Sequence, residues 1–229
     1  MIIGINGKIG SGKDTVGKII QYLLCDNVGG VELEDVTSSN DHDWWLEEQS
    51  GFDTKKFAGK LKAMGSLLTG IPVGKFEDQD FKKTNLGPEW SYELVGEDWV
   101  DGKPALVPMT VRTLLQKLGT EAMRDGLHTN VWVNALFADY KAIGWEPEDV
   151  SNWIITDMRF PNELEAVKDR GGITIRVTRD NGTRAIDIDP HPSETALDNS
   201  TFDYEIVNDG TIKELAEKVQ IILIKEGIL

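Results

Sequence analysis

The chain has 229 residues, and its 40% hydrophobic and 28% charged residues are ordinary for a globular protein. Its formal net charge of −15 argues against binding a polynucleotide over a broad surface, because nucleic-acid phosphates are bound by clustered lysine and arginine. No stretch approaches the roughly 18 unbroken apolar residues of a membrane span. We therefore expect neither a polynucleotide nor a membrane as partner, and the length predicts a single domain over residues 1–229.

The cysteine content and the N-terminus bear on the cellular compartment. The single Cys25 excludes an intrachain disulfide framework and fits a reducing compartment. The opening residues, MIIGIN, have neither a basic flank nor a small-residue cleavage site, so they predict a buried strand and not a signal peptide. We expect a cytoplasmic protein.

The first half of the chain begins with a regular pattern and then becomes irregular. Residues 2–6 predict a strand, and residues 15–24 predict a helix whose apolar side chains recur at helical spacing. The acidic segment 26–53 has a mixed pattern and is interpreted as an insertion. A short strand is expected to end near Phe57, followed by a helix to Leu68. Residues 71–108 show no clear period and are interpreted as a second insertion.

The second half alternates between helical and strand patterns. Helices are expected over residues 110–124 with a Thr110 cap, 130–144, 161–172 and 211–227, and strands over residues 152–160, 173–179 and 203–208. This alternation predicts an α/β fold with a central parallel sheet flanked by helices. Ligands of such sheets bind at the carboxyl ends of the strands. The polar segment 179–200 is long enough to form a lid.

The turn after the first strand carries the strongest functional signal. Gly7, Gly12 and Lys13 match the phosphate-binding pattern G-x-x-x-x-G-K-[ST], but Asp14 stands where a hydroxyl is expected. Glycines allow backbone N–H groups to surround an anion, and the following helix adds its positive N-terminal end. The pattern predicts nucleotide phosphate binding, and the alternative is a glycine-rich turn with a solvated lysine.

A second candidate site follows the strand at residues 152–160. Arg159, held by neighbouring carboxylates such as Asp157 and Glu163, could clamp a phosphate or hydrogen-bond a base edge. Asp157 could instead hold magnesium-bound water. The alternative for the whole group is a surface ion pair that caps a helix.

Two further candidates lie near the C-terminus. The turn at Asn208, Asp209 and Gly210 could bracket a base with its backbone groups, or could simply cap the last helix. The expected lid and its flanks contribute several residues suited to phosphoryl transfer, because arginines on a closing segment offset the charge of the transferred group. These residues are Arg176, Arg179, Arg184 and His191, of which the histidine could equally be a structural contact.

Seven segments of the chain, taken in order, resemble the deoxynucleoside monophosphate kinases of tailed phages. They are GKIGSGKDT, FAGKLKAM, VRTLLQKLGTE, VWV, DMRFPNELEAV, HPSE and NDG, with a weaker match over residues 26–53 and 71–108. That family belongs with the phosphomevalonate and nucleoside monophosphate kinases of the phosphate-loop class. The resemblance implies a P-loop kinase fold, ATP and Mg²⁺ as cofactors, a homodimer, and the host cytoplasm as location if the chain is viral.

The resemblance also implies roles for individual residues. Asp14 is implied as the Mg²⁺ ligand, with Thr15 as a phosphate contact. The residues expected to bind ATP are Gly10, Ser11, Gly12, Lys13, Asp14, Thr15, Asn208, Asp209 and Gly210. Those expected to bind the acceptor are Leu61, Lys62, Lys82, Arg112, Gly119, Thr120, Glu121, Trp132, Asp157, Arg159 and Glu163. Those expected to act in catalysis are Lys13, Lys82, Arg159 and Arg179.

The predicted function is ATP-dependent phosphorylation of a deoxynucleoside 5′-monophosphate. One alternative is a phosphate-loop kinase for another small phosphorylated acceptor, such as an isoprenoid or coenzyme A precursor. An aromatic base pocket would separate the two, and Phe57, Trp132 and Trp153 are available for it, although an apolar core would use the same residues. The other alternative is a slow nucleotide-hydrolysing switch that acts on a protein partner and needs a positioned Gln or Glu.

Overall fold

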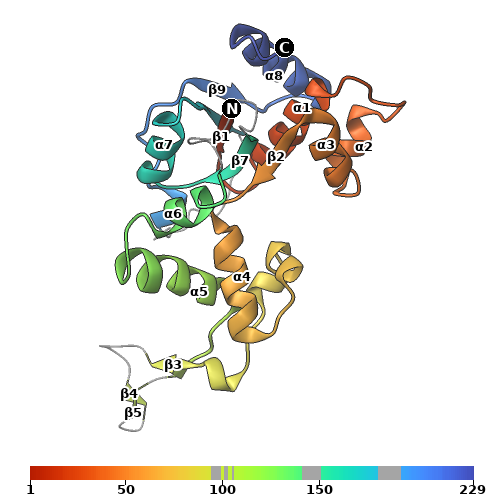
Figure 1. The fold of residues 1–229 in the computed structure, drawn as a ribbon. Coiled ribbons are helices and arrows are strands. Elements are labelled where there is room, and N and C mark those ends of the chain that lie inside the picture. The colour runs from red at the N-terminus through yellow and green to blue at the C-terminus, as the bar shows by residue number, and fades with distance from the viewer. Residues whose placement is uncertain (94–98, 101–102, 105, 141–150, 180–191) are drawn as a thin grey trace. The chain divides into compact units, whose positions relative to one another are not determined.

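The computed structural model describes residues 1–93, 99–100, 103–104, 106–140, 151–179 and 192–229. The chain forms two compact units (Figure 1), the first made of Met1–Phe57 with Leu136–Leu229 and the second of Ala58–Ala135. The expected insertion 26–53 lies in the first unit, and the expected insertion 71–108 lies in the second. Within the described residues, no helix is long and apolar enough to cross a membrane.

The first unit is built on a five-stranded parallel sheet with the strand order β2-β7-β1-β8-β9. Its strands are β1 (Ile2–Asn6), β2 (Phe52–Lys55), β7 (Asn152–Met158), β8 (Ile173–Thr178) and β9 (Tyr204–Val207). The three inner strands are rich in isoleucine and are almost wholly buried, as expected of a parallel sheet that is covered on both faces. The predicted central parallel sheet with flanking helices is confirmed.

Helices cover both faces of this sheet. Those of the first unit are α1 (Lys13–Leu24), α2 (Leu33–Ser38), α3 (Asp43–Ser50), α7 (Pro161–Lys168) and α8 (Ile212–Lys225), with a 3₁₀ turn at η6 (Pro192–Glu194). α1 contacts α8, α2 and α3, whereas α7 contacts β1 and β8. The side chains of Met158 and Val167 occupy the space beside Gly4 that a β-carbon would fill, so α7 lies on the opposite face of β1 from α1.

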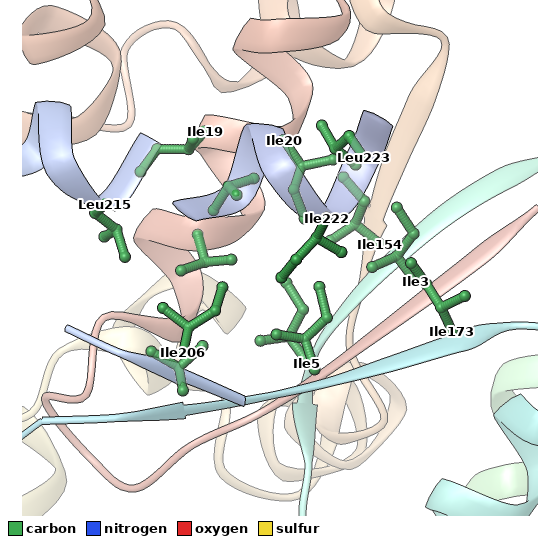
Figure 2. Packing of buried hydrophobic residues seen from close by; sticks show 14 of the residues in the cluster. Ile3, Ile5, Ile19, Ile20, Ile154, Ile173, Ile206, Leu215, Ile222 and Leu223 are labelled. Atoms are coloured by element: carbon green, nitrogen blue, oxygen red, sulfur yellow. The ribbon is translucent and has the colours of Figure 1, made fainter. Parts of the chain in front are cut away.

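The main core lies between the sheet and helices α1 and α8 (Figure 2). Alternate residues of each strand point toward these helices, as the two-residue period of a strand requires. The fully buried members include Ile5 of β1, Ile154 of β7, Ile20 of α1 and Leu223 of α8. This packing fixes α1 against β1, and it thereby holds the connecting loop between two rigid elements.

An aromatic cluster contacts the other face of the sheet. The ring of Phe137 stacks on Trp153 with 5.9 Å between centroids, and it meets Phe57 edge-on at 6.2 Å. The Arg170 guanidinium lies 3.9 Å from the Phe137 centroid on the same ring. Phe57, Phe137 and Trp153 are buried, so they form core and not an open surface on which a base could stack.

The second unit is helical with short irregular connections. Its helices are α4 (Ala58–Thr69), α5 (Val111–Gln116), the π-helix η4 (Lys117–Asp125) and the 3₁₀ turns η1 (Val73–Glu77), η2 (Phe81–Lys83) and η3 (Pro88–Trp90). Two-residue strands form two antiparallel pairs, β3 (Tyr92–Glu93) with β6 (Leu106–Val107) and β4 (Trp99–Val100) with β5 (Lys103–Pro104). α6 (Val131–Phe137) leads from the second unit into the first.

Two predicted helices differ from those in the structure. The Thr110 cap is confirmed, because its hydroxyl accepts a hydrogen bond from the Thr113 backbone N–H. The helix predicted over residues 110–124 changes to π geometry after Gln116, a change that apolar periodicity does not reveal. The helix predicted over 130–144 ends at Phe137, and residues 141–150 lie outside the described part of the chain.

Replacing Leu223 by Ala should lower the free energy of unfolding by about 2–5 kcal/mol, because the change leaves a cavity between α8 and the sheet. The neighbouring Ile224 is 56% exposed, so Ile224→Ala is the matched control and should change stability by less than about 0.5 kcal/mol. Urea unfolding measures both variants. Equal losses would contradict the described orientation of α8.

Candidate active site

The phosphate-binding pattern forms a loop between β1 and α1. Gly10 and Gly12 have φ angles of 78° and 92°, in the left-handed region where only glycine is unstrained. The Ser11 backbone N–H donates to the Lys8 carbonyl at 3.0 Å, which closes the turn. Lys13 is the first residue of α1, so the N-terminal end of this helix faces any anion held by the loop.

The Asn208 side chain holds this loop from the end of β9. Its buried Nδ2 donates to the Ser11 carbonyl at 2.9 Å, and its backbone N–H donates to the Thr178 carbonyl at 2.7 Å. In a planar trans peptide the C=O and the next N–H point in opposite directions, so this bond turns the Gly12 N–H away from Asn208. A β-carbon on Gly12 would lie 2.4 Å from the Asn208 amide nitrogen, which also requires glycine there.

The Ser11 hydroxyl is an unsatisfied group beneath the loop. Ser11 is 3% exposed, and its Oγ has no hydrogen-bond partner among the described residues. A β-carbon on Gly7 would come within 2.2 Å of this oxygen, so the first glycine of the pattern makes room for the hydroxyl. Ser11 also lines the cavity described below.

Asp14 lies in the first turn of α1 at the centre of a small charge network. Its carboxylate accepts from the Thr156 hydroxyl at 2.9 Å and lies 3.1 Å from Lys13 Nζ and 3.4 Å from Lys56 Nζ. Burial favours the neutral acid, but Lys13, Lys56 and the Thr156 hydroxyl outweigh it and lower the pKa of Asp14 to about 2. The carboxylate therefore stays charged at every physiological pH.

The donors around Asp14 suit Mg²⁺. The described residues contain no group of three or more His, Cys, Asp and Glu side chains that could hold a metal by themselves. Mg²⁺ typically takes only one or two carboxylates and completes its shell with water and substrate phosphates. Asp14, half-exposed and fully ionised next to the phosphate loop, meets that requirement with Thr15 as its neighbour on α1.

A cavity of about 450 Å³ opens beside the loop. Its lining comes from the phosphate loop, from the ends of β7 and β8, and from η6 and the residues after it. Four cationic residues line it, together with two carboxylates, and they are Lys8, Arg159, Arg176, Arg179, Glu194 and Asp198. The lining is therefore cationic although the whole chain carries a formal charge of −15, which favours an anionic ligand at this place.

Arg159 enters this cavity from the end of β7. Its Nη1 donates to the Ser193 carbonyl at 3.2 Å and also to the Glu194 carboxylate, which forms an ion pair with it. From the sequence, the predicted partners of this guanidinium are Asp157 and Glu163. The observed partner is 35 residues away along the chain and comes from the HPSE segment.

Asp157 and Glu163 act on the backbone. The Asp157 carboxylate accepts from the Phe57 N–H at 2.7 Å and so links the ends of β2 and β7. The buried Glu163 carboxylate accepts from the N–H groups of Arg159 at 2.7 Å and Phe160 at 3.2 Å, which caps α7. These bonds fix the backbone from which the Arg159 side chain extends.

Arg176 anchors the segment after η6. Its guanidinium donates to the carbonyls of Leu197, Asp198 and Ser200 and lies 4.4 Å from the Phe202 ring centroid. These contacts give Arg176 a structural role, and its predicted part in phosphoryl transfer stays a prediction. Arg179 is exposed at the end of β8 and lines the cavity. Arg184, His191 and most of the expected lid lie outside the described residues.

The NDG turn contacts the phosphate loop and directly precedes the cap of α8, while its predicted contact with a base stays a prediction. Asn208 holds the phosphate loop through its side chain. The sequence did not predict this contact, because the two residues lie 197 positions apart and no motif spacing links them. The Asp209 carboxylate pairs with Lys218 at 2.7 Å, and a hydrogen bond from that ammonium lowers the pKa of Asp209. Gly210 precedes Thr211, the residue that caps α8.

The remaining predicted acceptor residues lie in the second unit. Lys62 is buried and pairs with Glu77 at 2.6 Å, and Arg112 donates to the Gln79 side chain at 3.1 Å. Lys82 lies in η2, and Thr120 lies in η4.

Four of these residues lie in the π-helix η4 or contact it. The Leu61 side chain fills the space that a β-carbon on Gly119 would need, and the Trp132 indole N–H donates to the Gly119 carbonyl at 2.8 Å. Glu121 pairs with Lys117 at 3.0 Å on the exposed side. Trp132 thus has a structural bond in the second unit and belongs to its core.

The fold and the loop place the chain in a broad class. A phosphate loop between the central strand of a parallel sheet and its following helix, with arginines converging on the adjoining cavity, is the arrangement of a phosphate-loop phosphotransferase.

Comparison with known proteins narrows this class. Residues 100–219 match the family model described as deoxynucleotide monophosphate kinase. The chain is 27% identical to the deoxynucleoside-5′-monophosphate kinase of Escherichia phage T5, covering 91% of this chain and 89% of the relative. It is 30% identical, over 96% of this chain and 94% of the relative, to an Acanthamoeba polyphaga mimivirus protein named for the same activity. The chain belongs to the deoxynucleotide monophosphate kinase family and is a phosphotransferase.

Proposed function

We propose that this protein transfers the γ-phosphoryl group of ATP to a deoxynucleoside 5′-monophosphate. The observation that carries the proposal is the shared cavity, in which the phosphate loop and Arg159 line one cationic space of about 450 Å³. A volume of this size falls within the range of about 300–1,000 Å³ that is usual for small-molecule sites. The family membership supplies the acceptor class.

The proposed chemistry depends on positioning and charge. The loop amides and Lys13 hold the donor phosphates, while Arg159 offsets negative charge on the phosphoryl group or on the acceptor phosphate. A phosphate acceptor is already anionic at neutral pH, so no side chain needs to act as a strong base. Lys82, Arg112 and Arg179 stay predicted substrate contacts in this scheme.

Mg²⁺ fits the scheme at Asp14. Bound there, the ion would neutralise phosphate charge and orient the phosphate oxygens. The residues present to hold it are Asp14, directly or through water, with the hydroxyls of Thr15 and Thr156 nearby on α1 and β7. The low pKa of Asp14 keeps this ligand ionised, so loss of the proton imposes no cost on metal binding near neutral pH.

The charge pairs in the cavity disfavour a slow hydrolytic switch. Such a switch needs a Gln or Glu that positions water. The two carboxylates lining the cavity, Glu194 and Asp198, are paired with Arg159 and Lys8, respectively. Because both carboxylates are engaged in ion pairs, neither is free to position or activate a water molecule.

The proposed function is tested by ADP release from ATP and Mg²⁺ in the presence of each ribo- and deoxynucleoside monophosphate in turn. We expect release to depend on at least one deoxynucleotide and to be negligible with ATP alone, because both carboxylates among the described residues that line the cavity are already paired with cations. Equal release with and without every monophosphate would contradict the proposal and support the switch.

Replacing Asp14 by Asn should raise the Mg²⁺ concentration needed for half-maximal turnover by roughly tenfold, because one anionic ligand is lost. The matched control is Asp53→Asn, since Asp53 pairs with Lys55 at 3.0 Å and is 48% exposed, against 51% for Asp14. Turnover is measured over a Mg²⁺ series for both variants. An unchanged Mg²⁺ dependence of Asp14→Asn would remove Asp14 from the metal site.

A further inference from the structure

The Arg159 guanidinium is held through one nitrogen only. Nη1 donates to the Ser193 carbonyl and to the Glu194 carboxylate. Within residues 1–93, 106–140, 151–179 and 192–229, no acceptor contacts Arg159 through Nε or Nη2. These two contacts at Nη1, here called the tether, use one side of the planar guanidinium and leave the Nε–Nη2 side available.

The available side has a specific chemistry. Nε–H and the Nη2 group form a rigid fork of parallel donors that matches two oxygens of a phosphate. Arg159, Ser193 and Glu194 all line the cavity that also contains Gly7 and Ser11 of the phosphate loop. A ligand that accepts from this fork would thus share its cavity with the loop.

We propose that Glu194, assisted by the Ser193 carbonyl, is a positioning residue that presents the free fork of Arg159 to a tetrahedral phosphate in this cavity. The proposal rests on the proposed function in assigning that phosphate to a nucleotide substrate. Glu194 itself touches no reacting atom. Its carboxylate restricts the rotamers of a long side chain before the ligand arrives, so less conformational entropy is lost when the phosphate binds.

The opposite role for Glu194 would be competition. A carboxylate that merely occupied the guanidinium in place of the substrate would compete with the phosphate for the same donors. The observed contact is at Nη1, outside the Nε–Nη2 fork, so a phosphate and Glu194 can bind Arg159 together. The two roles predict opposite effects of removing Glu194 on phosphate affinity. Removing a positioning residue weakens phosphate binding, whereas removing a competitor strengthens it.

The test compares Glu194→Ala and Glu194→Gln with the unmodified chain in two assays. One is calorimetric binding of inorganic tripolyphosphate, and the other is the kcat and KM of nucleotide-dependent ADP release. We expect Glu194→Ala to weaken tripolyphosphate binding and to lower kcat/KM by roughly tenfold each, since a misplaced contact group loses much of its effect. Glu194→Gln should recover part of both losses, because the amide oxygen can still accept from Nη1. If the alanine variant does not fold, the glutamine variant alone is compared with the unmodified chain in both assays.

A double variant separates positioning from a general structural role. If Glu194 acts through Arg159, then Glu194→Ala should have little further effect on tripolyphosphate binding in an Arg159→Ala background. The matched control is Glu205→Gln, whose exposed carboxylate lies 3.9 Å from Arg176 at the same end of the sheet, and its affinity and turnover should stay within about twofold of the unmodified chain.

The outcomes distinguish this proposal from the proposed function. Tripolyphosphate binding that depends on Glu194, without turnover of any nucleoside monophosphate, would support the tether and contradict the proposed function. Turnover that is present and insensitive to Glu194→Ala would overturn the tether alone. Tighter tripolyphosphate binding by Glu194→Ala would also overturn the proposal. So would an equal loss of tripolyphosphate affinity when Glu194→Ala is introduced into the unmodified chain and into the Arg159→Ala variant.

Discussion

The parallel pairing of β1 with β7 on one side and with β8 on the other positions the phosphate loop and the arginines of the site. Because all three strands are parallel, their carboxyl ends meet at one edge of the sheet. The phosphate loop leaves β1 there, Arg159 follows β7, and Arg179 follows β8. Residues that are far apart in the sequence thereby line one cavity, and the isoleucine core beneath α1 and α8 keeps the strands in that register (Figure 2).

The loop conformation depends on a second constraint, the hydrogen bond from Asn208 to the Ser11 carbonyl. It sets the direction of the peptide that carries the Gly12 N–H, while the left-handed φ of Gly12 is open only to a residue without a β-carbon. The buried Ser11 hydroxyl has no hydrogen-bond partner among the described residues, so it could donate a hydrogen bond to a ligand oxygen. The loop is thus shaped before a nucleotide binds, which lowers the cost of ordering it.

Sequence patterns predicted what is local and missed what depends on folding. The phosphate loop, its flanking strand and helix, the parallel sheet and the Thr110 cap all follow from short-range spacing and propensity, and they are confirmed. The ion pair of Arg159 with Glu194 could not be read from spacing, because nearer carboxylates at 157 and 163 offered equally plausible partners. The aromatic residues left open as a base pocket proved to be core, since their exposure depends on packing.

If the cationic cavity and the phosphate loop serve one transfer between two nucleotides, a compound that joins adenosine and a deoxynucleoside through a polyphosphate chain should occupy both subsites at once. We expect this compound to bind on the order of tenfold or more tighter than ATP or the deoxynucleoside monophosphate alone, because one molecule then engages both subsites. Affinity no greater than that of ATP would mean that no acceptor subsite adjoins the donor phosphates, and it would exclude a shared transfer site.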